Sequence, residues 1–159
     1  MTAASSITAG SRILASQIQG VAPLGAYKIT GQSVTSSTTL VNDGDLYLSV
    51  AANGVYVVQG SFLVTGGAGN FKYTFTIPSG AGGNFSATQY TTGGTFESLT
   101  PITWTTVPTA QSGEAIWLYG LLVNSTTAGT LQLQWAQNTS NGTPTTVGAY
   151  SYITAWQIA

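Results

Sequence analysis

Apolar and polar residues alternate in several segments of the chain, with the period of two that marks half-buried β-strands. The pattern is strictest in 130–137, where Leu131, Leu133 and Trp135 fall on one face and Gln132 and Gln134 on the other. Clusters of Gly, Asn, Asp and Ser separate such segments. Together these signals predict ten strands, at 26–30, 34–41, 45–50, 54–64, 70–77, 84–91, 101–107, 114–123, 130–137 and 149–158.

These strands predict an all-β fold, a single-domain jelly-roll-like β-sandwich over 26–159 that follows an N-terminal extended arm over 1–25. A chain of 159 residues suits one domain. One short helical turn is possible at 11–19, with Ser11 as its cap. We expect the arm to order against a partner surface through Arg12, Ile13, Leu14 and Ile18, and a flexible leader is the alternative.

The segment 114–123 does not alternate, because it places apolar residues on both faces. Ile116, Leu118 and Leu122 share one face, which we expect to pack on the second sheet of the sandwich. The opposite face needs another cover, and a neighbouring subunit is the natural one. The predicted subunit interface therefore consists of Trp117, Tyr119, Leu121 and Val123.

Charge is unusually scarce, with three basic and four acidic residues and a net charge of −1. Three basic residues cannot neutralise a row of phosphates, so no nucleic-acid partner is expected. Weak electrostatic repulsion between copies favours self-association. No stretch of 18 uninterrupted apolar residues occurs and the amino terminus lacks a secretory pattern, so no membrane partner is expected.

Histidine and cysteine are absent, which removes the commonest general base, the commonest metal ligand and the best nucleophile. We therefore expect no enzyme activity, no cofactor and no metal. Asp43 and Asp45 flank Gly44 and could offer oxygens to a calcium ion or act as a glycosidase pair. The interpretation we adopt for 41–46 is a tight turn between two strands, because Asn, Asp and Gly favour that geometry.

Four tryptophans and eight tyrosines admit two interpretations. Their rings could stack on sugars, which would make the chain a carbohydrate-binding module. They could instead fill the core and a subunit interface, where large amphipathic rings are favoured. Trp135 lies on an alternating apolar face and is predicted to be a core residue, whereas Trp117 is the better candidate for an interface.

Two stretches of the sequence are specific in their wording. One is Val34-Thr-Ser-Ser-Thr-Thr-Leu-Val-Asn-Asp-Gly-Asp-Leu46 followed by Val50-Ala-Ala-Asn-Gly-Val-Tyr56. The other runs from Leu121 through Leu-Gln-Leu-Gln-Trp135 to Ser140, with the closing Tyr150-Ser-Tyr-Ile153. Both resemble small virion proteins of tailed phages that infect actinobacteria, and the likeness covers about half of the chain, 28–64 and 121–159.

The resemblance implies a structural role on the virion, as a capsid decoration (cement) protein or as a minor tail or fibre-tip protein that binds a host receptor or glycan. The chain is short and lacks the heptads of a fibre shaft, so we expect the first role and keep the second as the alternative. The expected partners are other copies of the chain, as a homotrimer, and the major capsid protein or another virion protein. The expected location is the capsid surface.

Overall fold

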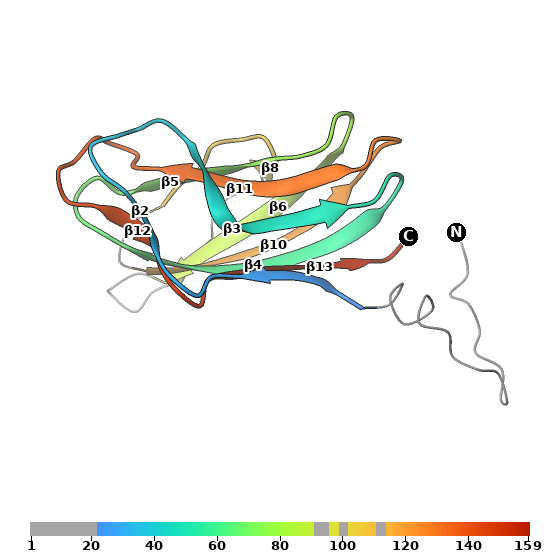
Figure 1. Ribbon diagram of the computed structural model, residues 1–159, viewed down its shortest axis with the longest axis horizontal. Coiled ribbons are helices and arrows are strands. Elements are labelled where there is room, and N and C mark those ends of the chain that lie inside the picture. Colours follow the sequence, from blue (N-terminus) through green and yellow to red (C-terminus); the bar gives the residue numbers. More distant parts are fainter. Residues whose placement is uncertain (1–21, 91–95, 99–101, 111–113) are drawn as a thin grey trace, which may run out of the picture.

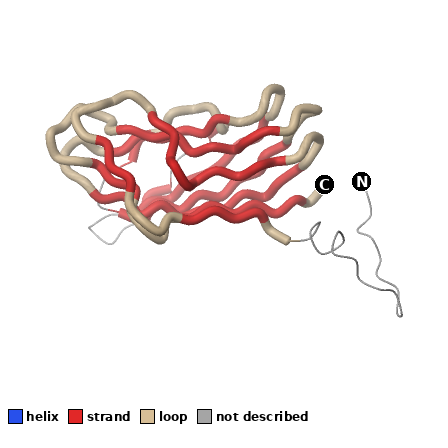
Figure 2. The backbone as a smooth tube through the Cα atoms, in the orientation of Figure 1, coloured by secondary structure: helices blue, strands red, loops and turns tan. Residues whose placement is uncertain are grey.

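The computed structural model describes residues 22–90, 96–98, 102–110 and 114–159. Every regular element in these ranges is a β-strand, and the strands form two antiparallel sheets that pack face to face (Figures 1 and 2). The predicted β-sandwich is thus confirmed. The predicted anchors of the arm, Arg12, Ile13, Leu14 and Ile18, lie outside the described residues.

Sheet A is the larger of the two and lies lowest in Figure 1. Its main path is β1 (Leu24–Tyr27), β13 (Tyr152–Gln157), β4 (Val55–Thr65), β10 (Glu114–Val123), β6 (Gly82–Tyr90) and β7 (Phe96–Ser98). Three short strands join it from the side, namely β2 (Gln32–Val34), β12 (Thr145–Val147) and β8 (Ile102–Thr103). Sheet B has the order β3 (Val41–Val50), β11 (Gly129–Ala136), β5 (Phe71–Thr76) and β9 (Thr109–Ala110).

The strand order is that of a jelly roll. The long strands of the chain pass alternately between the sheets, from β3 in sheet B to β4 in sheet A, and later from β10 in sheet A to β11 in sheet B. The orders β1-β13-β4-β10 and β3-β11-β5-β9 then face each other, as in double-sheet jelly rolls. Strands β6, β7 and β8 extend sheet A beyond β10.

Aromatic rings fill the space between the sheets. Phe75 of sheet B meets Trp104 edge to face at a centroid distance of 5.0 Å, and Phe85 of sheet A lies 4.8 Å from the same indole. The Trp104 indole N–H donates to the carbonyl oxygen of Leu121 at 2.9 Å, so this large ring is buried with its polar group satisfied. Trp135 is fully buried against Phe71, which confirms it as a core residue.

Two buried hydroxyl groups, those of Tyr73 and Thr154, depart from this pattern of satisfied polar groups. Neither oxygen has a hydrogen-bond partner within the described ranges. Burial also raises the pKa of the Tyr73 phenol, because the charged form loses its hydration.

Several predicted strand boundaries change for local reasons. Strand β10 has the predicted bounds. The predicted strand 34–41 is wrong, because β2 ends at Val34, β3 begins at Val41, and Ser36 between them adopts a positive φ of 53° that an extended strand cannot contain. The predicted strand 101–107 shrinks to β8. A turn follows it, in which the Thr106 amide donates to the Thr103 carbonyl at 3.0 Å and Trp104 turns into the core.

Gly120 of β10 has no room for a side chain in the core, and its substitution should be costly. A Cβ atom there would lie 2.6 Å from the Asn84 carbonyl oxygen and from the Phe85 Cβ. We expect Gly120→Ala to lower the free energy of unfolding by about 1–3 kcal/mol, as overpacking does. Gly82 of the adjoining β6 is the matched control, because a Cβ atom there would meet nothing within 4 Å. Urea denaturation of both variants measures the difference, and equal losses would contradict the packing described.

Candidate functional site

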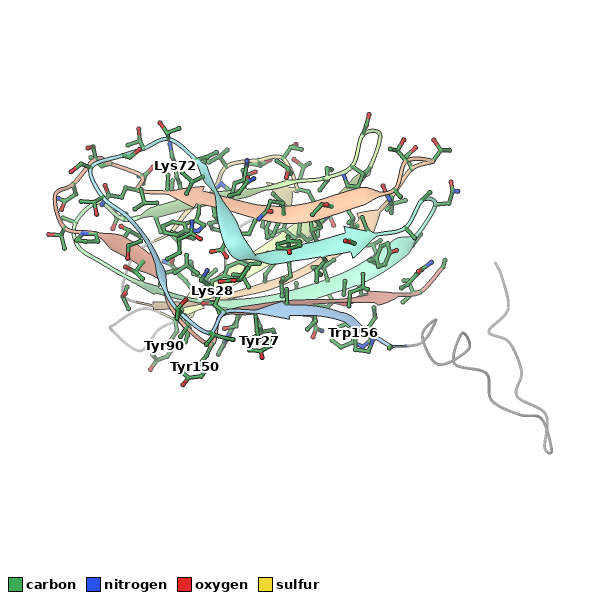
Figure 3. The ribbon with its side chains drawn as sticks, in the orientation of Figure 1. Tyr27, Lys28, Lys72, Tyr90, Tyr150 and Trp156 are labelled. Carbon is green, nitrogen blue, oxygen red and sulfur yellow. The ribbon has the colours of Figure 1, made fainter. Side chains whose placement is uncertain are left out.

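The outer face of sheet A exposes six aromatic side chains. In Figure 3, Tyr27, Tyr90 and Trp156 project from sheet A on the side away from sheet B, and so does Tyr150 on the loop before β13. The register places further exposed rings on the same face. We call this surface the aromatic face, and its aromatic residues are Tyr27, Tyr90, Trp117, Tyr119, Tyr152 and Trp156.

The residues of this face form rows across the strands. In one row Tyr27 of β1 stands opposite Tyr152 of β13, which stands opposite Ser61 of β4, which in turn stands opposite Trp117 of β10. Directly opposed residues of neighbouring strands point to the same side of a sheet. The exposed rings therefore belong to one continuous surface over β1, β13, β4 and β10.

Two stripes of exposed side chains run along this surface. The β10 stripe consists of Trp117, Tyr119, Leu121 and Val123, and the β13 stripe consists of Tyr27, Tyr152 and Trp156. Strand β4 separates them, and its outward residues Val57, Gln59 and Ser61 are buried or half-buried. Side chains therefore project from the face along the two stripes, and the surface over β4 between them lies lower.

The opposite surface of the sandwich is polar. On the outer side of sheet B, Gln134 of β11 donates from its amide nitrogen to the Asn42 side-chain oxygen at 2.8 Å. Lys72 of β5 lies on the same side, and Tyr47 of β3 is its exposed aromatic residue among those described. The two faces of one sandwich thus differ sharply, and the aromatic face carries no charged side chain among those that the structure describes.

The size of the aromatic face exceeds what a monomer usually exposes. With about 200 Å² for an aromatic side chain, the exposed fractions of the six rings amount to about 600 Å². The largest apolar patch of a typical monomer is about 300–600 Å², and here Leu63, Leu121 and Val123 add to the rings. Covering 600 Å² would contribute about 15 kcal/mol before the costs of association are subtracted.

The residues predicted for a subunit interface lie together on this face. Trp117, Tyr119, Leu121 and Val123 are 47%, 60%, 39% and 43% exposed, and they follow one another along the outer side of β10. Their contact with another subunit stays a prediction. The sequence analysis missed the β13 stripe, although the alternation of 149–158 already set Tyr152 and Trp156 on one side of their strand.

A second feature is a cluster of charges buried between the sheets. The Lys28 ammonium donates to Asp43 Oδ1 at 2.8 Å and to Asp45 Oδ2 at 2.9 Å. The side chains of Lys28 and Asp43 are 1% and 0% exposed, whereas that of Asp45 is 47% exposed. A buried charge is tolerated when it is paired and hydrogen-bonded, and here both conditions hold.

Asp43 also organises its own strand. Its Oδ1 accepts hydrogen bonds from the amides of Asp45 and Leu46, each at 3.0 Å, and its Oδ2 accepts one from the Trp135 indole at 3.1 Å. The predicted tight turn between two strands is wrong, because Val41–Val50 is a single strand. Its pairing with β11 shifts register between Asn42 and Tyr47, so the four residues between them form a bulge that the Asp43 carboxylate holds.

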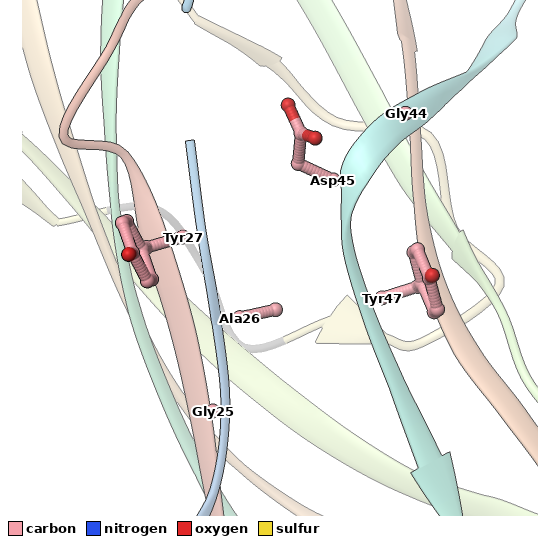
Figure 4. Close-up of a pocket in the computed structure, with 6 residues that line it drawn as sticks. All are labelled: Gly25, Ala26, Tyr27, Gly44, Asp45 and Tyr47. Carbon is pink, nitrogen blue, oxygen red and sulfur yellow. The ribbon is translucent and has the colours of Figure 1, made fainter. Parts of the chain in front are cut away.

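An open pocket of about 350 Å³ lies beside this cluster (Figure 4). Gly25, Ala26 and Tyr27 of β1 line one side, and Gly44, Asp45 and Tyr47 of β3 line the other. The two tyrosine rings point away from each other, toward the outer faces of the two sheets, so they do not form a cage around a ligand. The Asp45 carboxylate is already bound to Lys28, and within the described ranges no three His, Cys, Asp or Glu residues gather around a point that could hold a metal ion.

Comparisons with known proteins add no relative. No protein-family model matches the chain, and no curated protein matches it. The resemblance to phage virion proteins therefore stays a prediction. Within the described part of the chain, no helix is long and apolar enough to cross a membrane.

The buried charge cluster predicts a large effect of removing its cation. We expect Lys28→Met to lower the free energy of unfolding by about 3–5 kcal/mol, because the Asp43 carboxylate then stays buried without a counter-ion. Lys72→Met is the matched control on the polar side of sheet B and should change stability by about 0.5 kcal/mol or less. Adding Asp43→Asn to Lys28→Met should restore part of the loss. Urea denaturation tests all three variants, and equal effects of the two lysine substitutions would refute a structural role of the pair.

Proposed function

We propose that this chain is a structural protein of a tailed-phage particle, and specifically a capsid decoration protein that attaches to the head surface as an oligomer. The resemblance of 28–64 and 121–159 to virion proteins motivates the proposal. The structural observation that supports it best is the contrast between the two faces of the sandwich. An aromatic face without charge among its described side chains suits permanent contact with protein, and a polar face of Gln, Thr and Ser suits exposure to water.

Self-association and attachment to the capsid are carried out by different parts of the chain. The aromatic face joins copies to one another, and the arm over 1–25 attaches the oligomer to the shell. Strand β1, which follows the arm, lies at the margin of the aromatic face beside β13. An oligomer joined through this face carries several arms, so its attachment is multivalent and stronger than that of one chain.

The mechanism is stabilisation by binding. A protein that binds the assembled shell and not its separated subunits shifts the assembly equilibrium by mass action. Interface area buried across the joints between capsid subunits opposes their separation. This role requires shape and surface but no catalytic group.

Deletion of residues 2–20 tests the role of the arm. We expect the shortened chain to lose attachment to particles that lack the protein, because Arg12, Ile13, Leu14 and Ile18 are removed. Its thermal unfolding midpoint should be unchanged, because the deletion leaves every strand that the structure describes, from β1 at Leu24 onward. The matched control is deletion of residues 2–10, which keeps all four predicted anchors and should keep attachment. Co-sedimentation with the particles measures binding, and full binding by the longer deletion would rule out the arm as the anchor.

A second candidate function is that of a minor tail or fibre-tip protein that binds a glycan. The observation in its favour is that polar side chains able to bond hydroxyl groups, such as Gln59 and Asn84, lie beside the exposed rings of the aromatic face. Rings could stack on sugars while these groups orient them.

Titration with a panel of bacterial surface glycans separates the two functions. A decoration protein should show no saturable change in tryptophan fluorescence, although Trp117 and Trp156 are exposed and would report binding. A saturable change that Trp117→Ala abolishes and Tyr47→Ala preserves would favour the glycan-binding function.

A further inference from the structure

We infer that the aromatic face is covered by the same face of a second copy of this chain, in a twofold arrangement in which the β10 stripe of each copy lies on the β13 stripe of the other. The inference rests on the oligomer of the proposed function and adds to it the surface, the symmetry and the residues that meet.

Area favours two copies over three. A standard interface buries about 800 Å² on each partner. The six exposed rings supply about 600 Å², and the aliphatic residues of β4 and β10 bring the whole face close to that value. In a ring of three, the state expected from the sequence, each contact would join one stripe to one neighbour and would use about half of the face. A face-to-face pair uses all of it in a single contact.

Charge is compatible with a face that meets itself. In a twofold contact each group meets the same surface, so a charge on the face would approach a like charge or be buried without a partner. The charged side chains that the structure describes are Lys28 and Asp43 between the sheets, Asp45 at the pocket and Lys72 on sheet B. None of these four lies on the aromatic face.

Side-chain size sets the direction of the twofold axis. The middle row of the face runs from Gly25 and Thr154 through Gln59 to Tyr119 and Ser86. It is low on the β1 and β13 side, where Gly25 and Thr154 are small, and high at Tyr119, the most exposed member of the β10 stripe. Packed sheets keep their strands aligned within about 30°.

A twofold axis parallel to β4 therefore places each row of one copy on the same row of the other copy, with its direction reversed. Tyr119 of one copy then lies over Thr154 and Gly25 of the other, and Trp117 lies over Tyr152. An axis across the strands would instead set Tyr119 on Tyr119 and leave small residues facing small residues, with a gap between them. In the middle row this axis packs the large Tyr119 on small residues, and close packing there favours the axis parallel to β4.

The mass of the full-length chain in solution is the first test. Sedimentation velocity should give twice the 16.3 kDa of one chain. Tyr119→Lys should raise the dissociation constant by about tenfold or more, because it places a charge at the centre of the contact. Tyr47→Lys is the matched control, since Tyr47 is a similarly exposed ring on sheet B, and it should leave the mass unchanged. Circular dichroism verifies that both variants are folded.

Cross-linking tests the direction of the axis. The sequence contains no native cysteine, so each variant carries a single reactive thiol. Gly25→Cys and Ser86→Cys replace small residues at opposite ends of the middle row, and a Cβ atom at Gly25 makes only an ordinary contact at 3.8 Å. A short thiol-reactive linker should join the two variants when they are mixed and should not join either variant to itself. Efficient self-linking of each variant would overturn the axis parallel to β4.

Three other outcomes would overturn the inference. A mass of three chains would contradict the twofold contact, and a mass of one chain at all concentrations would contradict self-association. A monomer whose tryptophan fluorescence responds to a soluble glycan would assign the face to that ligand. Because these measurements use no particles, their failure is distinct from a failure of the chain to attach to a capsid.

Discussion

The buried ion pair between Lys28 and Asp43 is the constraint on which the arrangement of the two sheets depends. Lys28 follows β1 of sheet A, and its main chain bonds to the segment before β13, with the Lys28 amide donating to the Ser151 carbonyl and the Tyr150 amide donating to the Lys28 carbonyl, both at 2.9 Å. Its side chain reaches β3 of sheet B. One residue therefore joins the open edges of both sheets, in a position where neither charge can be left alone.

This pair also fixes details on either side of it. The Asp43 carboxylate holds the bulge of β3 through two backbone amides and orients Trp135 in the core. On the other side, β1 is held beside β13, which sets Tyr27 in line with Tyr152 on the aromatic face. A chain with seven charged residues thus places three of them in one cluster and leaves its largest apolar face without charge among the described side chains. The surface available for association follows from where the charges are placed.

Local pattern predicted the fold class and the strands whose alternation is strong. Strand β11 differs from its prediction by one residue at each end, because burial on one face imposes a period of two that sequence shows directly. Strand β10 has the predicted bounds although it does not alternate, because its long apolar run is bounded by turn residues. The segment Asn42-Asp-Gly-Asp45 could not be interpreted in this way. Residues that favour a tight turn also favour a bulge, and the choice depends on Lys28, which lies far away in sequence. The β10 stripe could be predicted because one strand carries it, whereas the β13 stripe needs the pairing of β1 with β13, which local pattern does not specify.

The location of the protein on intact particles tests the account most directly. The chain would be labelled at a small tag after Ala159 and the label imaged by electron microscopy on particles that carry it. The proposed role predicts label distributed over the surface of the head. Label confined to the tail or its tip would contradict the decoration role and would favour the glycan-binding function of the same aromatic face. Particles without any label would contradict a role in the virion altogether.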